Sequence, residues 1–367
     1  MSEAISQEAK IAQATFDIEN NVQNLDDSSD LYDSIYAYDA EEQEAIREAA
    51  PWKTDPNYFK HVAISSIALI KMAIHARSGG SIEIMGVMTG KIRENGFVVM
   101  DVFPLPVEGT ETRVNAMGQA YEYMVQFDTT LKQVGREENI VGWYHSHPGY
   151  GCWLSGIDVG TQSMNQQFQD PFLALVIDPN RTISAGKVEI GAFRTYPKDY
   201  KNPLAEESEY QSIPSDKLAD FGVHANEYYK LDCSYFKSSL DSKLLDLLWN
   251  KYWVSTLSHS SLLANHEFAT KQIKDISLKT SRATEKVEQS PLLNFTTSHS
   301  RGGDSSQYQL LTTSNNQAQK TGRPTLSNDL KVVSEATSDA IKLGSEQLQG
   351  LISREIRDQL FMNICKH

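Results

Sequence analysis

Cysteine is scarce in this chain of 367 residues, which holds only Cys152, Cys233 and Cys365. Three scattered cysteines, an odd number, provide no disulfide framework, so we expect a protein that folds in a reducing compartment. Long apolar runs are missing too, because no stretch approaches the roughly 18 residues of a membrane-spanning helix. The first residues are polar and acidic, so we expect no signal peptide. A soluble intracellular protein is the expectation.

Basic residues are outnumbered by acidic ones. The chain has 34 Lys and Arg against 48 Asp and Glu, a formal net charge of -14. A surplus of negative charge disfavours non-specific nucleic-acid binding and adhesion to anionic membranes, so we expect neither nucleic acid nor membrane as a partner. The charge is compatible with a partner that presents a basic face, although most acidic proteins are simply soluble.

Strand-like and helix-like segments alternate between residues 55 and 230, which indicates an α/β layered domain. Its predicted strands cover residues 62–64, 81–88, 97–105, 140–145, 172–178 and 187–196. Predicted helices start after a cap at Ser65 and cover 117–134 and 158–168. Residues 106–113 are predicted as a loop and residues 178–181 as a turn.

Segments of different composition flank this domain. Residues 1–54 form a polar arm, for which a flexible segment and a segment packed on the domain or on a neighbouring subunit are equally open. We expect a helical extension over 231–280, with a helix at 240–257, and a disordered linker over 281–327, rich in Ser, Thr, Asn and Gln. Helical periodicity returns over 328–367. That helix has little core of its own, so we expect it to dock into a bundle with other subunits or to fold back on residues 240–257.

One motif concentrates the chemistry. His145 and His147 are two residues apart at the end of an apolar segment, and Asp158 follows eleven residues after the second histidine. Side chains alternate faces along a strand, so the two imidazoles point the same way. If the glycine-rich loop 149–156 doubles back, Asp158 becomes a third ligand. Three protein ligands with a fourth position open are typical of catalytic zinc.

A His-x-His pair alone is common and usually has no metal function, so the neighbouring residues matter. Ser155 resembles a helix N-cap, and Glu83 lies inside an apolar segment. A carboxylate buried in a strand is costly unless it is paired or functional. Glu83 is therefore a candidate general base.

Together, Glu83, His145-Ser-His147, Ser155 and Asp158 resemble the JAMM (MPN-plus) metalloprotease motif. The resemblance extends beyond the motif. From about residue 39 to 263 the sequence is similar to the catalytic subunits of the COP-nine signalosome. Three flanking blocks carry it, Val107-Glu-Gly-Thr-Glu-Thr-Arg113, Gly191-Ala-Phe-Arg-Thr-Tyr-Pro197 and Tyr235-Phe-Lys-Ser-Ser-Leu240. It implies an MPN domain with a mixed β-sheet flanked by helices, followed by a C-terminal helical region for assembly.

The resemblance also implies an activity. One Zn2+ per chain would be bound by His145, His147 and Asp158, with Glu83 as the base and Ser155 either stabilising an oxyanion or capping a helix. The family hydrolyses isopeptide bonds, and the signalosome member removes the ubiquitin-like Nedd modifier from cullins (deneddylation). Implied partners are the other signalosome subunits, especially the non-catalytic MPN subunit, with neddylated cullin-RING ligases as substrate. The implied location is cytoplasm and nucleus.

Two regulatory residues are hypotheses from the same region. Arg113 lies where the family carries an insertion near the site, and it could pair with Asp158 and block zinc or substrate until partner subunits move the loop. Glu111 could sense those partners. A solvated loop is the alternative for both. Cys152 lies inside the candidate metal loop. A role as a nucleophile, or as a thiol that disturbs the metal, is an alternative that the sequence disfavours.

Three other functions compete. A zinc deaminase is disfavoured, because its His-x-Glu and Pro-Cys-x-x-Cys signature is missing from the sequence. An MPN scaffold would lack ligands that this chain has. A JAMM deubiquitinase acting on ubiquitin conjugates shares the zinc motif, and only the flanking blocks argue against it.

Overall fold

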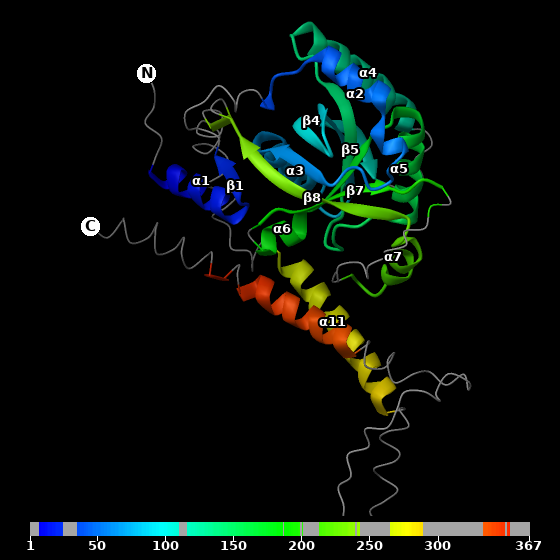
Figure 1. The fold of residues 1–367 in the computed structure, drawn as a ribbon. Coiled ribbons are helices and arrows are strands. Elements are labelled where there is room, and N and C mark those ends of the chain that lie inside the picture. Colours follow the sequence, from blue (N-terminus) through cyan, green and yellow to red (C-terminus); the bar gives the residue numbers. More distant parts are fainter. Residues whose placement is uncertain are drawn as a thin grey trace, which may run out of the picture. The chain divides into compact units, whose positions relative to one another are not determined.

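The computed structural model describes residues 7–24, 35–109, 116–185, 187–198, 200, 213–238, 241–242, 265–288, 333–348 and 351–352 (Figure 1). The chain divides into two compact units, Met1–Phe268 with Glu346–His367, and Ala269–Ser345. Within the described ranges, no helix has both the length and the apolar character needed to cross a membrane.

An eight-stranded mixed sheet forms the first unit, in the order β1-β8-β2-β4-β3-β5-β6-β7. β8 also pairs with β7, so the ladder that runs from β8 to β7 closes on itself. The sheet is mixed: β8 pairs in parallel with β1 and β2, β2 with β4, and β5 with β6, whereas the pairs β4–β3, β3–β5, β6–β7 and β7–β8 are antiparallel. The strands are β1 Val22–Asn24, β2 His61–Ser65, β3 Glu83–Arg93, β4 Gly96–Gly109, β5 Asn139–Ser146, β6 Leu173–Asp178, β7 Glu189–Thr195 and β8 Tyr228–Lys237. The predicted α/β class with a mixed sheet is confirmed.

Helices cover both faces of this sheet. The predicted cap at Ser65 is confirmed, because its Oγ accepts a hydrogen bond from the Ala68 N–H at 3.1 Å and begins α3. The other predicted helices of the domain begin and end within two residues of their expected bounds. The helices are α1 Gln7–Glu19, α2 Ala40–Ala49, the 3-10 turn η2 Pro51–Lys53, α3 Ser66–Ser78, α4 Ala116–Gln133, α5 Gly156–Gln169, α6 Pro179–Ala185, α7 Leu218–His224 and α11 His266–Glu288.

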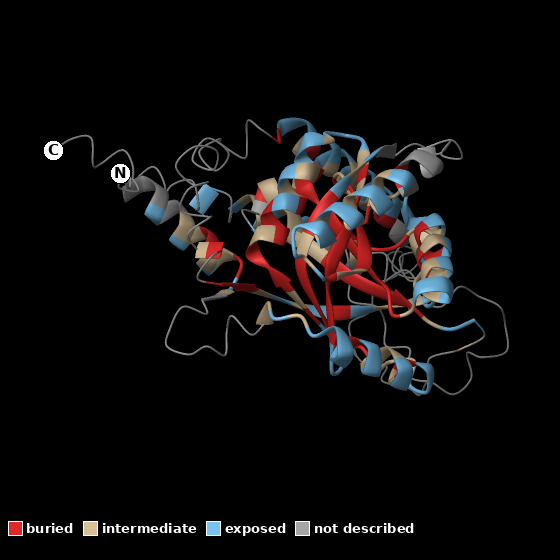
Figure 2. Cartoon of the chain, turned by 90° about the horizontal axis from the view of Figure 1, so that it is seen from above, coloured by how far each residue is buried: buried red, intermediate tan, exposed pale blue. Residues whose placement is uncertain are grey.

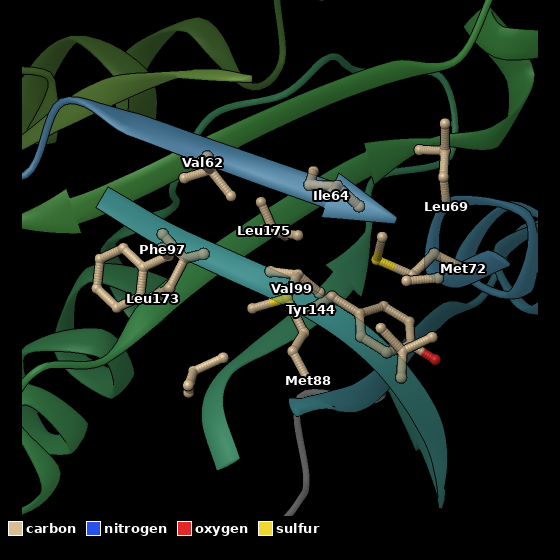
Figure 3. Close-up of a cluster of buried hydrophobic side chains, with 14 of the residues drawn as sticks. Val62, Ile64, Leu69, Met72, Met88, Phe97, Val99, Tyr144, Leu173 and Leu175 are labelled. Carbon is tan, nitrogen blue, oxygen red and sulfur yellow. The ribbon is translucent and has the colours of Figure 1, made fainter. Parts of the chain in front are cut away.

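β6 shows how the core is divided between the two faces. All six of its residues are buried, as expected for a strand covered on both sides. Leu173 and Leu175 belong to the larger apolar cluster with β2 and α3, whereas Ala174 and Val176 point into a second cluster beside α5. Figure 3 shows Leu173 and Leu175 among Val62, Ile64, Leu69 and Met72. Figure 2 shows buried strands beneath helices whose outer surfaces are exposed.

The N-terminal segment packs on the domain. β1 adds to β8 in parallel, and Asn20, 1% exposed, accepts a hydrogen bond from the Val188 N–H at 2.9 Å. Asp17 pairs with the buried Lys237 of β8 at 2.5 Å. For residues 7–24, the packed alternative therefore applies and the flexible one does not.

Two predicted irregular segments are wrong. The expected turn at 178–181 is the start of α6, because the Asp178 carboxylate accepts the Asn180 and Arg181 N–H groups at 3.0 Å each and so begins a helix. The expected loop from residue 106 is strand up to Gly109, which pairs with Glu83. A neighbouring strand that offers free backbone groups thus extends β4 beyond its apolar part.

Two expected boundaries also shift. Residue 230 lies inside β8, whose residues pair with β7 and β2, so the sheet of the domain continues to Lys237. The start of the expected linker at residue 281 lies inside α11, which continues to Glu288. Residues 289–327 and most of 240–257 lie outside the described residues.

In the second unit, α11 packs against a helix over residues 333–348. Lys279 Nζ lies 2.6 Å from Asp339 Oδ2, and Ala283, Ala336 and Asp339 are buried. For its described part, the predicted C-terminal helix therefore has α11 as a partner. Apolar side chains of this helix pair are still exposed, namely Ile273, Leu278 and Ile341.

Candidate metal centre

His145 and His147 are placed by the end of β5. His145 lies in the strand between Met85 of β3 and Val176 of β6. The His147 N–H donates to the Ile177 carbonyl at 2.9 Å, which continues the alignment with β6 beyond the last residue of β5. Both imidazoles are buried, and their Nε2 atoms are 3.1 Å apart. The predicted alternation therefore brings the two rings together.

Asp158 completes the group from the first turn of α5. Its Oδ2 lies 3.4 Å from His145 Nε2 and 3.5 Å from His147 Nε2. Burial by itself would raise the pKa of Asp158, but the two neighbouring imidazoles hold this pKa well below its ordinary value. These three residues form the only group of three or more potential metal ligands among the described residues.

The donor atoms fit zinc. His147 Nδ1 lies 3.0 Å from the Gly151 carbonyl, which can only accept, so Nδ1 carries a hydrogen and, in the neutral imidazole that binds a metal, Nε2 keeps its lone pair. This lone pair faces His145 Nε2 and the Asp158 carboxylate. Electron-rich atoms that converge in a buried place are favourable around a cation, and two imidazoles with one carboxylate are a ligand set of zinc.

Ser155 is the N-cap of α5. Its Oγ accepts from the Asp158 N–H at 3.3 Å, and the Asp158 Oδ2 accepts from the Ser155 N–H at 2.9 Å, which makes a capping box. The Ser155 hydroxyl also donates to that Oδ2 at 2.6 Å. Ser155 thus caps the helix and orients the aspartate. Its role toward an oxyanion stays a prediction.

Glu83 is the first residue of β3 and is half-buried, not enclosed as expected inside an apolar strand. The β3–β5 register pairs Met85 with His145, and the Ile84 N–H donates to Ser146 Oγ at 3.0 Å. The same register continued by two residues places Glu83 beside His147. Glu83 therefore stands next to the candidate metal ligands, as its predicted role requires.

Tyr150 was not singled out from the sequence. Its hydroxyl donates a hydrogen bond to Glu83 Oε1, and its ring stacks on His147 with centroids 4.4 Å apart. Burial, followed by the charge of Glu83, raises the pKa of this phenol, so it is a neutral donor. Its position between two glycines, Gly149 and Gly151, is a turn pattern that gave no hint of a contact with Glu83.

Two more side chains support His145 from behind. The Trp143 indole stacks on its ring with centroids 4.6 Å apart. The Trp143 Nε1–H donates to Gln162 Oε1 at 2.8 Å, and Gln162, fully buried in α5, donates to the Phe172 carbonyl. The Trp143 ring that stacks on His145 is therefore held by hydrogen bonds that join β5, α5 and the residue before β6.

Of the remaining predicted residues, Cys152 does not join the group. Cys152 is buried beside Leu154 and Phe193 in the apolar cluster under α5, and burial raises the pKa of its thiol well above the ordinary value. A protonated, enclosed thiol is a poor ligand and nucleophile. Arg113 and Glu111 lie outside the described residues.

Comparisons with known protein families match two regions of this chain. The family described as JAB1/Mov34/MPN/PAD-1 ubiquitin protease matches residues 57–171, and the Cop9 signalosome subunit 5 C-terminal domain matches residues 258–362.

Similar relatives cover nearly the whole chain. A COP9 signalosome complex subunit 5 from Yarrowia lipolytica is 53% identical over 95% of this chain and 98% of its own length. Subunit 5a from Arabidopsis thaliana is 54% identical over 96% of this chain and 92% of its own. Subunit 5 from Drosophila melanogaster is 52% identical over 96% and 97%. The chain therefore belongs to the family of COP9 signalosome complex subunit 5 proteins, with a JAB/MPN domain that contains the candidate metal centre.

Proposed function

We propose that this protein is a zinc-dependent isopeptidase that removes the ubiquitin-like Nedd modifier from cullins as the catalytic subunit of the COP9 signalosome. The matching family is described as a ubiquitin protease, which supports hydrolysis of a bond to a ubiquitin-like protein. The relatives are named as subunits of the signalosome complex, which supports the assembly. In this role the protein regulates cullin-RING ubiquitin ligases.

The observation that carries the proposal is the convergence of His145 Nε2, His147 Nε2 and Asp158 Oδ2 within 3.5 Å of one another, beside Glu83. A purely structural zinc site would close with a fourth protein ligand, and the described residues offer three. An open position next to a carboxylate base is the arrangement of a hydrolase. It also argues against a scaffold role without catalysis.

The residues would divide the work as follows. Zinc held by His145, His147 and Asp158 would supply a Lewis acid, which lowers the pKa of a water molecule to about 7. Glu83 accepts the proton of the attacking water and passes it to the departing lysine amine. The Tyr150 hydroxyl, which donates to Glu83, holds this carboxylate in place. Ser155 is the proposed donor to the oxyanion.

Assembly with other subunits is proposed for the C-terminal helices. Ile273, Leu278 and Ile341 are at least half exposed on the helix pair of the second unit, and partner helices would cover such side chains. The other signalosome subunits, especially the non-catalytic MPN subunit, are the proposed partners. Cytoplasm and nucleus are the proposed locations.

A second candidate is a deubiquitinase with the same chemistry. The description of the matching family as a ubiquitin protease favours it. The two substrates differ in the modifier and not in the bond that is cleaved, so the metal centre serves both. A direct comparison of substrates separates them.

The decisive experiment is cleavage of a neddylated cullin and of a ubiquitin conjugate by the assembled complex. Wild type is compared with Glu83→Gln and with Glu94→Gln, a matched control at the exposed β3–β4 turn. Loss of a general base costs about 100- to 10,000-fold in rate. We expect such a loss of deneddylation for Glu83→Gln with zinc still bound, and none for Glu94→Gln.

Other outcomes are equally clear. Equal cleavage by wild type and Glu83→Gln would remove Glu83 as the base. Preferential cleavage of the ubiquitin conjugate would replace the first candidate by the second. No cleavage of either conjugate by the zinc-loaded complex would contradict both.

A further inference from the structure

The loop that carries Tyr150 is anchored by a carboxylate outside the JAMM motif. Asp178, the last residue of β6, is fully buried. Its Oδ1 accepts the Gly149 N–H at 3.0 Å, and its Oδ2 accepts the Gly151 N–H at 2.9 Å. One side chain thus accepts hydrogen bonds from the loop backbone on both sides of Tyr150.

Capping of α6 explains only part of this arrangement. Oδ1 also accepts the Asn180 and Arg181 N–H groups at 3.0 Å each, as an N-cap does. The Arg181 Nε lies 3.3 Å from Oδ2. Helix capping requires only one carboxylate oxygen, however. It does not explain the hydrogen bond from the N–H of Gly151, which is 27 residues earlier in the chain. The second oxygen serves the loop.

The loop requires such an anchor. Gly149 and Gly151 have φ angles of +94° and +88°, and glycine is the residue that loses the most conformational freedom when it is ordered. A turn with two such positions has many alternative conformations. Bonds to both glycine N–H groups from a rigid strand end select one of them.

The selected conformation bears directly on the metal ligands. The Gly151 carbonyl accepts the hydrogen of His147 Nδ1, which determines the tautomer and the ring orientation. Tyr150 then lies against the His147 ring and donates to Glu83. The chain of contacts therefore leads from Asp178 through Gly151 to His147, and through Tyr150 to Glu83.

We propose that Asp178 is a positioning residue of the metal centre, which holds the Gly149–Gly151 turn so that His147 presents Nε2 to zinc. The proposal rests on the proposed function only for the identity of the metal. Groups that orient a ligand in this way typically contribute about 10- to 100-fold to metal affinity.

The test is zinc affinity of the full-length chain, measured by competition with a chromophoric chelator, and the absorption spectrum of the Co2+-substituted protein. Asp178→Asn keeps the size of the side chain. Its NH2 group, which is a donor, replaces one of the carboxylate oxygens that accept hydrogen bonds from the backbone N–H groups. We expect the zinc dissociation constant to rise at least tenfold and the Co2+ bands to shift.

Asp170→Asn is the matched control. Asp170 is the C-cap of α5 and pairs with Arg194 at 2.8 Å, so this change also breaks an ion pair of the same domain. Asp170 follows the last turn of α5, whereas Asp158 lies in the first turn. At 1.5 Å per residue along the helix axis, the two residues are about 18 Å apart. We expect its zinc affinity and Co2+ spectrum to equal those of wild type.

Gly151→Ala guards against misfolding of the Asp178 variant. It leaves the carboxylate and α6 intact and strains only the turn, because alanine disfavours a positive φ. We expect it also to weaken zinc binding at least tenfold. Wild-type affinity in a folded Asp178→Asn or in Gly151→Ala would overturn the proposal. Tight zinc binding by wild type without cleavage of any conjugate would contradict the proposed function and leave the role of Asp178 standing.

Discussion

Replacing Ser155 with alanine separates the two roles that this residue can have. The hydroxyl caps α5 by accepting the Asp158 N–H at 3.3 Å, and it donates to Asp158 Oδ2 at 2.6 Å. Loss of a serine cap costs typically about 1 kcal/mol. For a domain of this size we expect Tm to fall by roughly 2–4 °C. The Ser155 N–H still donates to Asp158 after the change, so the aspartate keeps one of its two local partners.

The effect on catalysis should be much larger than the effect on stability. Removing one donor to an oxyanion lowers kcat by about 100- to 1,000-fold. Loss of the cap, even if all of its ~1 kcal/mol entered the activation barrier, would account for only about fivefold. Steady-state cleavage of a neddylated cullin by the assembled complex gives kcat and KM, and a chelator titration of the same sample gives zinc occupancy.

Asp39→Ala is the control for capping alone. Asp39 begins α2 by accepting the Glu41 and Glu42 N–H groups at 2.9 and 3.1 Å, and its surroundings are exposed. We expect a similar loss of stability with unchanged kcat. A drop of kcat in Ser155→Ala of fivefold or less, at full zinc occupancy, would show that Ser155 only caps the helix.

Two further predictions concern the metal and the thiols. Zinc at 100 times its dissociation constant should stabilise the folded chain by about 2.7 kcal/mol, which raises Tm. We expect Asp158→Asn to abolish this rise in Tm and Mg2+ not to reproduce it. A rise in Tm that survives in Asp158→Asn would place the metal elsewhere. Burial raises the pKa of the Cys233 thiol to about 12 and that of Cys152 well above its ordinary value, so in a Cys365→Ser variant we expect almost no reaction with a thiol reagent at pH 8 until the protein is unfolded. The stability gained from protonated thiols is complete below the unfolded pKa of about 8.5 and is lost as pH rises toward 12. The denaturant concentration at the unfolding midpoint should therefore fall over that pH range. Rapid labelling of the native protein by the thiol reagent would contradict the burial of these cysteines.

Local rules predicted much of the site. The two-residue alternation of a strand placed His145 and His147 on one face, and the capping preference of serine located the starts of α3 and α5. The same capping rule could have found α6, because Asp178 followed by Pro179 is an N-cap with proline in the first helical turn. The same residues also favour a turn, because turns and helices can begin with the same residues.

Contacts between distant segments could not be predicted in this way. Nothing in the composition of Val22–Asn24 distinguishes a strand paired with β8 from an extended arm. The Tyr150 hydroxyl reaches Glu83, 67 residues earlier, and depends on a loop conformation that is selected by Asp178. Such pairings depend on where whole strands lie, and short segments carry little information about that.

By itself, the sequence determined the chemistry available to this protein: the identities of the candidate metal ligands and the candidate base, their spacing along strand and helix, and the apolar periodicity that produces an α/β domain. Only the tertiary structure decided how these groups meet. Closure of the sheet through β7 and β8, the β3–β5 register that sets Glu83 beside His147, and the grip of Asp178 on the glycine turn are long-range contacts. Their geometry follows from packing of the entire domain, because neither backbone pairing nor the conformation of glycine is specified by local residue preference.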